Sequence, residues 1–358
     1  MATGSKKTFL TVDPERLNRI SIPVSTGWLL SSVMEARGKQ ELWTQRKPEV
    51  LNALREQAVV QSVESSNRIE GVTVARDRLR PIILEGAKPI DRSEEELVGY
   101  KLALNRIFTT EKPISVSLTT ILNLHELAQG GFSGDAGKLK SRDNEIIEIL
   151  SNGERRVRFV PTSARETPAT LERLCQSYNL VVREERVPIL LAIAAFVLDF
   201  LCIHPFRDGN GRVSRLLTTL LLHQNYFVVG RYISLERLIE DTKQDYYRTL
   251  EQCSVGWHDG TNDPLSWFNY FLSTLRRAYT EFERQVESAD TGAAKTDIVR
   301  AVVLEQIGEF TLADIAARCP AVSTQQIKKT LSAMKDEGAV QLNGRGRGAR
   351  WNLTQTKR

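Results

Sequence analysis

The sequence predicts a mainly α-helical protein that ends in a small helical domain with a basic β-hairpin. Apolar residues recur at three- and four-residue spacing in several long stretches, which is the period of a helix with one buried face. Strand-like alternation is confined to two short stretches, residues 144–160 and 340–353. The 358 residues are enough for two or three domains with buried cores.

Residues 1–110 are expected to form an N-terminal helical region in which residues 48–71 make one helix. The apolar residues of this helix follow helical spacing, and Gly71 suits its C-terminal cap. Glu70 lies in the last turn, where a carboxylate opposes the helix dipole unless a cation pairs with it. From this fragment alone, a solvent-exposed surface glutamate is the simpler interpretation.

Residues 144–160 predict a β-hairpin. Weak alternation of apolar and polar side chains flanks Asn152-Gly153, and Asn-Gly between such runs is the strongest short hairpin signal. From the residues alone, an ordinary surface hairpin and a functional one are equally good interpretations.

The most informative stretch is 204–215, which reads His-Pro-Phe-Arg-Asp-Gly-Asn-Gly-Arg-Val-Ser-Arg. It joins two apolar helices, 190–203 and 213–222, and a polar turn in such a place cannot bury its charges cheaply. Pro205 stops the first helix. The backbone N–H groups of Gly209 to Gly211 are then unpaired at the start of the next helix, where phosphate binds readily.

The side chains of this turn point to the same chemistry. A new helix starts near Gly211 or Arg212, and Arg212 and Arg215, three residues apart, can grip phosphate oxygens. Asp208 offers a hard oxygen ligand for Mg²⁺, which usually accompanies nucleotide phosphates. His204 is a candidate general base. The turn is therefore predicted to be an anion-binding active site rather than a corner with solvated charges.

This stretch resembles the motif of the Fic family, HPFx[DE]GNGRxxR. The resemblance implies a Fic-type helical bundle with a β-hairpin flap, formed by a catalytic core over residues 111–287. It also implies transfer of AMP from ATP to a Tyr, Thr or Ser hydroxyl of a target protein, with release of pyrophosphate. All fixed positions of the motif match: His204, Pro205, Phe206, Asp208, Gly209, Asn210, Gly211, Arg212 and Arg215.

The resemblance also implies a role for each site residue. His204 would deprotonate the attacking hydroxyl, and Asp208 would hold Mg²⁺ on the α- and β-phosphates. Arg212 and Arg215 would hold the β- and γ-phosphates. Phosphoryl-type transfer needs positioning and charge neutralisation more than covalent help, which agrees with these roles. The anion hole would be formed by Gly209, Asn210 and Gly211.

A second motif of the family, the inhibitory [ST]xxxE[GN], matches Ser66, Glu70 and Gly71. The resemblance implies that Glu70 pairs with Arg215, blocks the γ-phosphate site and makes the enzyme autoinhibited. Family members often form dimers that hold this glutamate in place, so a homodimer is expected. At the same site Glu70 would instead position water if the reaction were removal of AMP from modified proteins.

In Fic proteins the hairpin acts as a flap that holds the target segment by strand addition. Its edge in this chain would be Ile146, Ile147, Glu148 and Ile149. The family often shows a Gly-x-[FY]-R lead-in, and residues 137–142, Gly-Lys-Leu-Lys-Ser-Arg, match it only loosely. The register of the flap is therefore left open.

A Tyr-Tyr segment in the family lines the adenine pocket, with a preceding asparagine near the nucleotide. Here the pair is Tyr246-Tyr247, and Asp241 stands where the asparagine is expected. A carboxylate cannot donate the hydrogen bond of an amide. Tyr247 is expected to stack on adenine. Other nucleotides or a phosphocholine donor remain alternatives to ATP, because the sequence does not indicate which residues form the pocket for the transferred group.

Residues 288–295 are small and polar, which predicts a linker. Beyond it, residues 296–358 resemble a winged helix-turn-helix domain. Ser323 with Gln326 predicts a capping box at the start of the third helix. The elements expected are helices over 296–307, 312–319 and 323–337 and strands over 340–342 and 350–353.

The excess positive charge lies mainly in this tail. Residues 296–358 hold ten Lys and Arg against six Asp and Glu, a net charge of +4, and the rest of the chain carries +1. Duplex DNA and a docking protein are equal alternatives for its partner. A DNA-binding regulator with a nucleotide-sensing core is a further hypothesis. The basic residues expected to touch phosphates are Lys328, Lys329, Arg345, Arg347 and Arg350.

Composition excludes other classes of protein. No run of eighteen apolar residues is present, and the N-terminus lacks the apolar core of a leader, so a cytoplasmic location without a membrane partner is expected. The four cysteines lack CxxC spacing and are expected to be reduced and buried. His125, His223 and His258 are expected to be structural.

Overall fold

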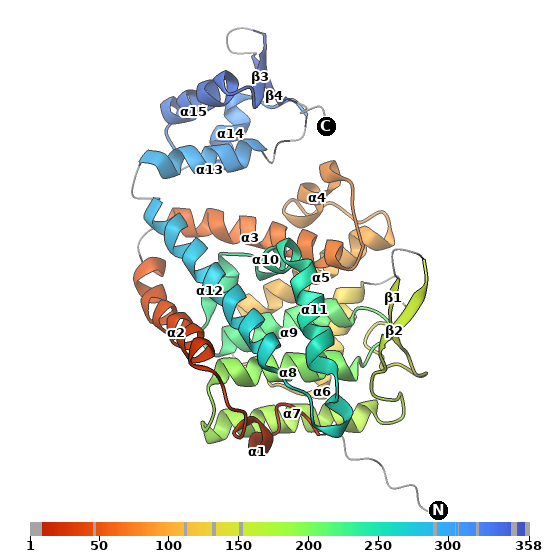
Figure 1. The fold of residues 1–358 in the computed structure, drawn as a ribbon. Helices are drawn as coiled ribbons and strands as arrows, with labels where there is room; N and C mark the ends of the chain where they lie inside the picture. The colour runs from red at the N-terminus through yellow and green to blue at the C-terminus, as the bar shows by residue number, and fades with distance from the viewer. Residues whose placement is uncertain are drawn as a thin grey trace, which may run out of the picture.

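The computed structural model describes residues 9–45, 48–110, 113–130, 134–149, 153–288, 292–304, 306, 308–319, 322–344 and 349–354. Within these residues the chain is mainly helical, and its strands form two short hairpins (Figure 1), which confirms the predicted fold class. No helix in this part of the chain is long and apolar enough to cross a membrane. All four cysteines are buried free thiols, as expected.

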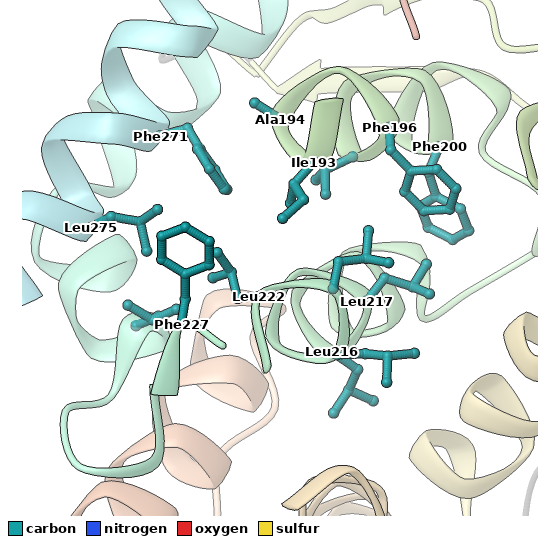
Figure 2. Packing of buried hydrophobic residues seen from close by; sticks show 14 of the residues in the cluster. Ile193, Ala194, Phe196, Phe200, Leu216, Leu217, Leu222, Phe227, Phe271 and Leu275 are labelled. Carbon is teal, nitrogen blue, oxygen red and sulfur yellow. The ribbon is translucent and has the colours of Figure 1, made fainter. Parts of the chain in front are cut away.

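The centre of the molecule is the pair α8 (Ile189–Ile203) and α9 (Asn210–Gln224). Almost every residue of α8 is buried, which explains its unbroken apolar sequence. Figure 2 shows Ile193 of α8 and Leu217 of α9 meeting in this core, beside Phe271 of α12 (Leu265–Ser288). Each such side chain contributes about 1.5–3 kcal/mol on burial. The turn between α8 and α9 is thus held by the most deeply buried part of the fold.

Several helices pack directly against this pair, and others pack against those neighbours. α7 lies along α8, α2 lies along α12, and α5 and α6 pack against α9. Their bounds, with the shorter elements between them, are α1 (Pro14–Leu17), α2 (Val24–Thr44), α3 (Pro48–Ile69), α4 (Arg76–Ile83), α5 (Arg92–Thr109), α6 (Leu118–Gln129), α7 (Thr167–Glu184), η1 (Val228–Arg231), α10 (Leu235–Asp241), α11 (Lys243–Ser254) and η2 (Trp257–Asp259).

A buried aspartate ties the N-terminal segment to the core. Asp199 of α8 accepts hydrogen bonds from the backbone N–H groups of Thr11 (3.0 Å) and Val12 (2.8 Å) and from Nε1 of Trp257 (2.7 Å). Burial raises the pKa of Asp199 and these three donors oppose that shift. The only acidic residue of an otherwise apolar helix therefore fastens residues that lie far away in the sequence.

The first hairpin joins β1 (Ile146–Ile149) and β2 (Arg155–Phe159), antiparallel, with Ile147 opposite Val157. This confirms the hairpin predicted from the alternation of residues 144–160. Asn152 of the predicted turn lies outside the described residues, whereas Gly153 has φ 83° and supplies the positive φ that such a turn requires.

The C-terminal segment forms the elements predicted for it, around an apolar cluster of its own. Two details differ. The first helix begins at Gly292, inside the predicted linker, and the capping box lies at Thr311 and Asp314. Ser323 does accept from the Gln326 N–H, but the Gln326 side chain donates instead to Thr296 (2.9 Å). The bounds are α13 (Gly292–Leu304), α14 (Leu312–Arg318), α15 (Thr324–Asp336), β3 (Val340–Asn343) and β4 (Arg350–Leu353).

Candidate active site

The polar turn between α8 and α9 has a closely constrained backbone. α8 ends at Ile203, and His204 follows with φ 49°, in the left-handed region that few residues other than glycine adopt. Gly209 is also left-handed, with φ 81°. The side chain of Asn210 accepts from the Phe206 N–H (2.9 Å) and donates to the Phe206 carbonyl (2.8 Å). α9 therefore begins at Asn210, one residue before the predicted start.

His204 has the arrangement of a base. Its Nδ1 lies 3.3 Å from the carbonyl oxygen of Leu201, a bond in which the ring nitrogen must be the donor. The lone pair of the neutral ring is then on Nε2. Burial lowers the pKa of His204 to about 4, and the nearby cation of Lys140 acts in the same direction. At neutral pH the imidazole is thus unprotonated and able to accept a proton.

Next to His204 is a cavity of about 190 Å³. It is enclosed by the end of α3, the first hairpin, α8, the turn and α11. Five of the residues predicted for the site line it together: Glu70, Ile146, His204, Gly211 and Tyr247.

Arg215 of α9 is buried and faces the end of α3. Its Nη2 donates to Glu70 Oε1 (2.9 Å) and to the Ser66 carbonyl (2.8 Å), and its Nε donates to the Ser66 hydroxyl (2.9 Å). Burial opposes the charge, but Glu70 and other neighbours raise the pKa of Arg215. Its Nη1 is buried without a hydrogen-bond partner among the described residues. A buried cationic donor without a partner is unfavourable, so this nitrogen is a place for an anion.

Gly211 is required for this arrangement. A Cβ at Gly211 would lie 2.1 Å from Glu70 Oε1 and 3.2 Å from Arg215 Nη1. The carboxylate of Glu70 therefore lies directly against the backbone of the first turn of α9. This is the place where the unpaired N–H groups of a helix start attract an anion.

Arg212 does not join Arg215 beside Glu70, although the resemblance implied that the two arginines hold neighbouring phosphates. It is fully buried and its Nη1 lies 2.8 Å from Glu96 Oε2 on α5 and 3.2 Å from the Ala128 carbonyl on α6. Residues three apart lie on the same face of a helix, but long arginine side chains can turn from there toward different partners. Here Glu96 binds Arg212 on one side of α9 and Glu70 binds Arg215 on the other, so the two guanidinium groups lie apart.

Asp208 is exposed at the edge of the turn. Its carboxylate accepts from the Gly209 N–H (2.7 Å) and from Arg92 (3.1 Å). The described residues contain no cluster of three or more His, Cys, Asp or Glu that could hold a metal alone. A single accessible carboxylate suits Mg²⁺, which keeps several waters and shares its coordination sphere with phosphate oxygens.

Asp241 does not line the cavity. Its carboxylate pairs with Arg237 one helical turn earlier (3.3 Å) and with Arg277 of α12 (2.9 Å), both at the surface. The asparagine-like role expected for it from the resemblance is therefore not supported by its position. Tyr247 does line the cavity, as expected, and the guanidinium of Arg158 lies over its ring at 5.4 Å.

The residues predicted for the flap edge have different surroundings: some face the cavity and others face solvent. Ile146 lines the cavity, Ile147 is exposed, and Glu148 accepts from Arg156 of the opposite strand. Arg156 also donates to Glu251 of α11 (2.7 Å), which ties the hairpin to the helix that carries Tyr247. Ile149 ends the strand β1.

Two residues that sequence reasoning did not assign to the site, Lys140 and Arg158, support it. Lys140 donates its backbone N–H to the Pro205 carbonyl (2.9 Å) and its Nζ to the Ile203 carbonyl (3.2 Å), and burial lowers its pKa to about 8. The sequence signal for Lys140 was its position within residues 137–142, which match the lead-in of the family only loosely. Tyr246 and Arg158 line the cavity beside Tyr247. His125 stacks on Phe206 at 3.7 Å and so has the structural role predicted for it.

Comparison with known proteins shows what the part of the chain around this turn is similar to. Residues 115–222 match the model of the Fic/DOC family. A protein adenylyltransferase Fic from Nematostella vectensis is 26% identical over 213 residues, which cover 56% of this chain and 44% of that protein. Protein adenylyltransferase fic-1 from Caenorhabditis elegans is 27% identical over 199 residues, 52% of this chain and 35% of that protein. The chain thus spans less than half the length of these curated relatives.

The fold has also been observed before. A Fic family protein from Desulfovibrio desulfuricans G20 superposes with a TM-score of 0.59 at 21% identity, and the match covers 95% of this chain and 98% of that chain. A Fic domain containing signaling protein from Bacteroides thetaiotaomicron VPI-5482 gives a TM-score of 0.59 at 24% identity, over 72% and 97%. These matches confirm the Fic-type helical fold expected from the resemblance.

Proposed function

We propose that this chain, which carries a Fic domain over residues 115–222, is a protein adenylyltransferase that transfers AMP from ATP to a Tyr, Thr or Ser hydroxyl of a target protein. One observation carries the proposal. A neutral, half-buried His204 and the unpaired, buried Nη1 of Arg215 flank the glycine-bearing start of α9. Together they offer a base and an anion site beside one cavity.

The reaction follows from these positions. The target hydroxyl gives its proton to Nε2 of His204 while its oxygen attacks the α-phosphorus of ATP. The bond from the α-phosphorus to the bridging oxygen of pyrophosphate breaks, and pyrophosphate leaves. The N–H groups of Asn210 and Gly211 stabilise charge on the phosphate oxygens, whereas that of Gly209 is already bonded to Asp208. Arg215 neutralises the outer phosphates. His204 then returns its proton to solvent.

Mg²⁺ is the metal that this site suits, with Asp208 as its protein ligand. When bound, the ion would neutralise charge on the phosphates of ATP. The carboxylate of Asp208 is accessible although it pairs with Arg92 and, at 3.9 Å, with Arg212, so it is able to take part in such a shared coordination sphere.

Glu70 is proposed to inhibit this activity. Its carboxylate already holds Nη2 of Arg215 and lies against Gly211. An outer phosphate of ATP in this place would meet a like charge at close range, which raises the free energy of ATP binding. Ser66 and Gly71 shape the end of α3 that presents Glu70.

Intact mass spectrometry after incubation with ATP and Mg²⁺ tests both proposals. Glu70→Gly protein should label itself or a supplied target with the mass of one AMP, more than wild type does. Glu70→Gly with His204→Ala should not label. Equal labelling of wild type and Glu70→Gly would remove the inhibitory role, and labelling that survives His204→Ala would remove the proposed base.

The same cavity supports a second reaction, the removal of AMP from modified proteins. The carboxylate of Glu70 lines the cavity together with His204 and is partly accessible, so it is able to orient a water molecule. An adenylylated target incubated with wild type and with Glu70→Gly distinguishes the two reactions. Loss of AMP only with wild type would establish hydrolysis.

The tail, residues 292–354, is proposed to be a winged helix-turn-helix domain that binds duplex DNA. Lys328 and Lys329 are exposed on α15 and Arg350 is exposed on β4, whereas Arg345 and Arg347 lie outside the described residues. Filter binding of a DNA duplex at two salt concentrations is the test, since phosphate contacts weaken steeply with salt. Absence of binding at low salt would leave protein docking as its role.

A homodimer and a cytoplasmic location are proposed as well. Light scattering after size exclusion tests the homodimer.

A further inference from the structure

The last turn of α3 is the part of the chain that presents Glu70, and its carbonyl groups are fully partnered. A helix leaves its last four carbonyls without partners of its own. Here the Asn67 and Arg68 carbonyls accept from backbone N–H groups of the following turn. The Ser66 carbonyl accepts from Arg215, and the Ile69 carbonyl accepts from Nζ of Lys243 at 2.8 Å.

Two of these four carbonyls therefore accept from cations in distant parts of the chain. Arg215 belongs to the anion site, and Lys243 is the first residue of α11, 174 positions after Ile69. The C-terminal end of a helix carries partial negative charge, so a cation there stabilises the helix end. Because Ile69 immediately precedes Glu70, the bond from Lys243 fixes the backbone from which the inhibitory carboxylate extends.

Lys243 also connects this helix end to the cavity wall. Its ammonium lies 5.9 Å from the ring centroid of Tyr247, one turn further along α11. Tyr247 lines the cavity, with Arg158 of the hairpin over its ring at 5.4 Å. The end of α3 and the wall of the cavity are thus held by the same side chain.

Other contacts also hold α3, up to and including Arg68 in its last turn. Arg68 pairs with both carboxylate oxygens of Glu240 on α10, and Ser62 bonds to Ser234 at 2.9 Å. Loss of the Lys243 ammonium would therefore leave α3 in place and free only its final residues. Gly71, with φ 82°, follows directly, so no further helix restrains Glu70 from the other side.

We propose that Lys243 is a positioning residue that sets how firmly Glu70 closes the anion site. The inference rests on the proposed inhibition by Glu70 and goes beyond it, because it places the control of inhibition on the first residue of α11. Lys243 acts through the Ile69 carbonyl and not through contact with ATP.

The test measures ATP affinity by titration calorimetry in proteins that also carry His204→Ala, so that no turnover occurs. Lys243→Met should tighten ATP binding roughly two- to fivefold, the size expected for loss of one cation at a helix end. Lys243→Arg should restore the wild-type affinity. In the Glu70→Gly background, Lys243→Met should add nothing, because the group that it positions is gone. Lys335→Met, in the last turn of α15, is the matched control.

Hydrogen exchange of residues 66–72 gives a second readout that does not depend on activity. Faster exchange in Lys243→Met together with tighter ATP binding supports the inference. Faster exchange with unchanged affinity would reduce the contact to a purely structural one and overturn it. If Glu70→Gly alone leaves ATP affinity unchanged, the proposed inhibition fails and this inference fails with it; if Glu70→Gly tightens binding and Lys243→Met does not, only this inference fails.

Discussion

Arg212 and Arg215, three residues apart on α9, have different roles. Arg215 keeps one buried nitrogen without a partner among the described residues, close to Gly211, whereas Arg212 bonds to Glu96 and to the Ala128 carbonyl on the other side of α9. The motif alone predicts a phosphate role for both. The structure shows that Arg212 joins α9 to α5, so its replacement would act on stability as well as on any ligand.

Glu96→Gln should destabilise the protein by about 3 kcal/mol, because it leaves the buried guanidinium of Arg212 without its main countercharge. Urea unfolding measures this difference. Glu85→Gln is the control, since the Arg80–Glu85 pair is 3.8 Å long and exposed and should contribute less than about 1 kcal/mol. Equal effects of the two substitutions would contradict the role assigned to Arg212.

Arg158 is the side chain of the cavity that the sequence did not reveal. Its Nε is buried without a partner among the described residues, and its guanidinium lies over Tyr247. In the Glu70→Gly background, Arg158→Ala should raise the KM for ATP about tenfold, the size of one charge-assisted hydrogen bond. Arg155→Ala, exposed on the same strand, should not change it. An unchanged KM in Arg158→Ala would show that Arg158 does not contact the nucleotide.

At the residue scale, the sequence predicted those site residues that belong to a short motif, and it missed those whose partners lie far away in the chain. The glycines of the turn, His204 and the pairing of Glu70 with Arg215 follow a contiguous motif or a recognisable second one. The partners of Arg212 and Asp241 do not, because Glu96 and Arg277 lie on other helices. Arg158 has no motif at all, and only the fold of the hairpin over α11 brings it to the cavity.

At the scale of elements, helical periodicity predicted most of the helices that hold the site. The burial of α8 explains why its sequence is so uniformly apolar, and the three helices and two strands of the tail appear in the predicted order. Helix ends were less predictable, since they depend on tertiary partners. The Gln326 side chain bonds to Thr296 and does not close a capping box. At the end of α3, two backbone carbonyls accept hydrogen bonds from Lys243 and Arg215.

Close packing of α5 against α6 depends on one glycine. A Cβ at Gly99 would lie 1.9 Å from the Leu127 carbonyl oxygen, so Gly99→Ala must separate the two helices. We expect a loss of at least about 3 kcal/mol in the free energy of unfolding, at the upper end for overpacking. Gly27→Ala in α2 meets no atom within 4 Å and should instead stabilise by about 0.5–1 kcal/mol. Denaturant unfolding of both variants is the measurement, and a shared sign would contradict the packing argument.

At the scale of the whole molecule, the turn between α8 and α9 is held from several directions. α3 reaches it through Glu70, α6 through His125, and the loop before the first hairpin through Lys140. Each of these contacts joins segments far apart in the sequence. The site is therefore a product of the complete helical assembly, and the pKa values of its groups are set by that assembly.

This dependence predicts how stability changes with acid. Burial lowers the pKa of both His125 and His204 from 6.5 to about 4 in the folded protein. Between pH 6.5 and 4 the unfolded chain therefore binds more protons than the folded one, and the free energy of unfolding falls as the pH falls. Above pH 6.5 both forms are neutral and neither histidine contributes. Each should add a slope of up to about 1.4 kcal/mol per pH unit within this range.

The double variant His125→Gln/His204→Gln removes both titrations and leaves the carboxylates unchanged. Its free energy of unfolding should therefore fall less steeply than that of wild type between pH 6.5 and 4, and the two slopes should agree from pH 7 to 8. Urea unfolding at half-unit pH steps gives both curves, and their difference cancels the carboxylates common to the two proteins. Parallel curves throughout would mean that neither imidazole is held neutral by the fold, and His204 would then lack the low pKa that makes it a free base at neutral pH.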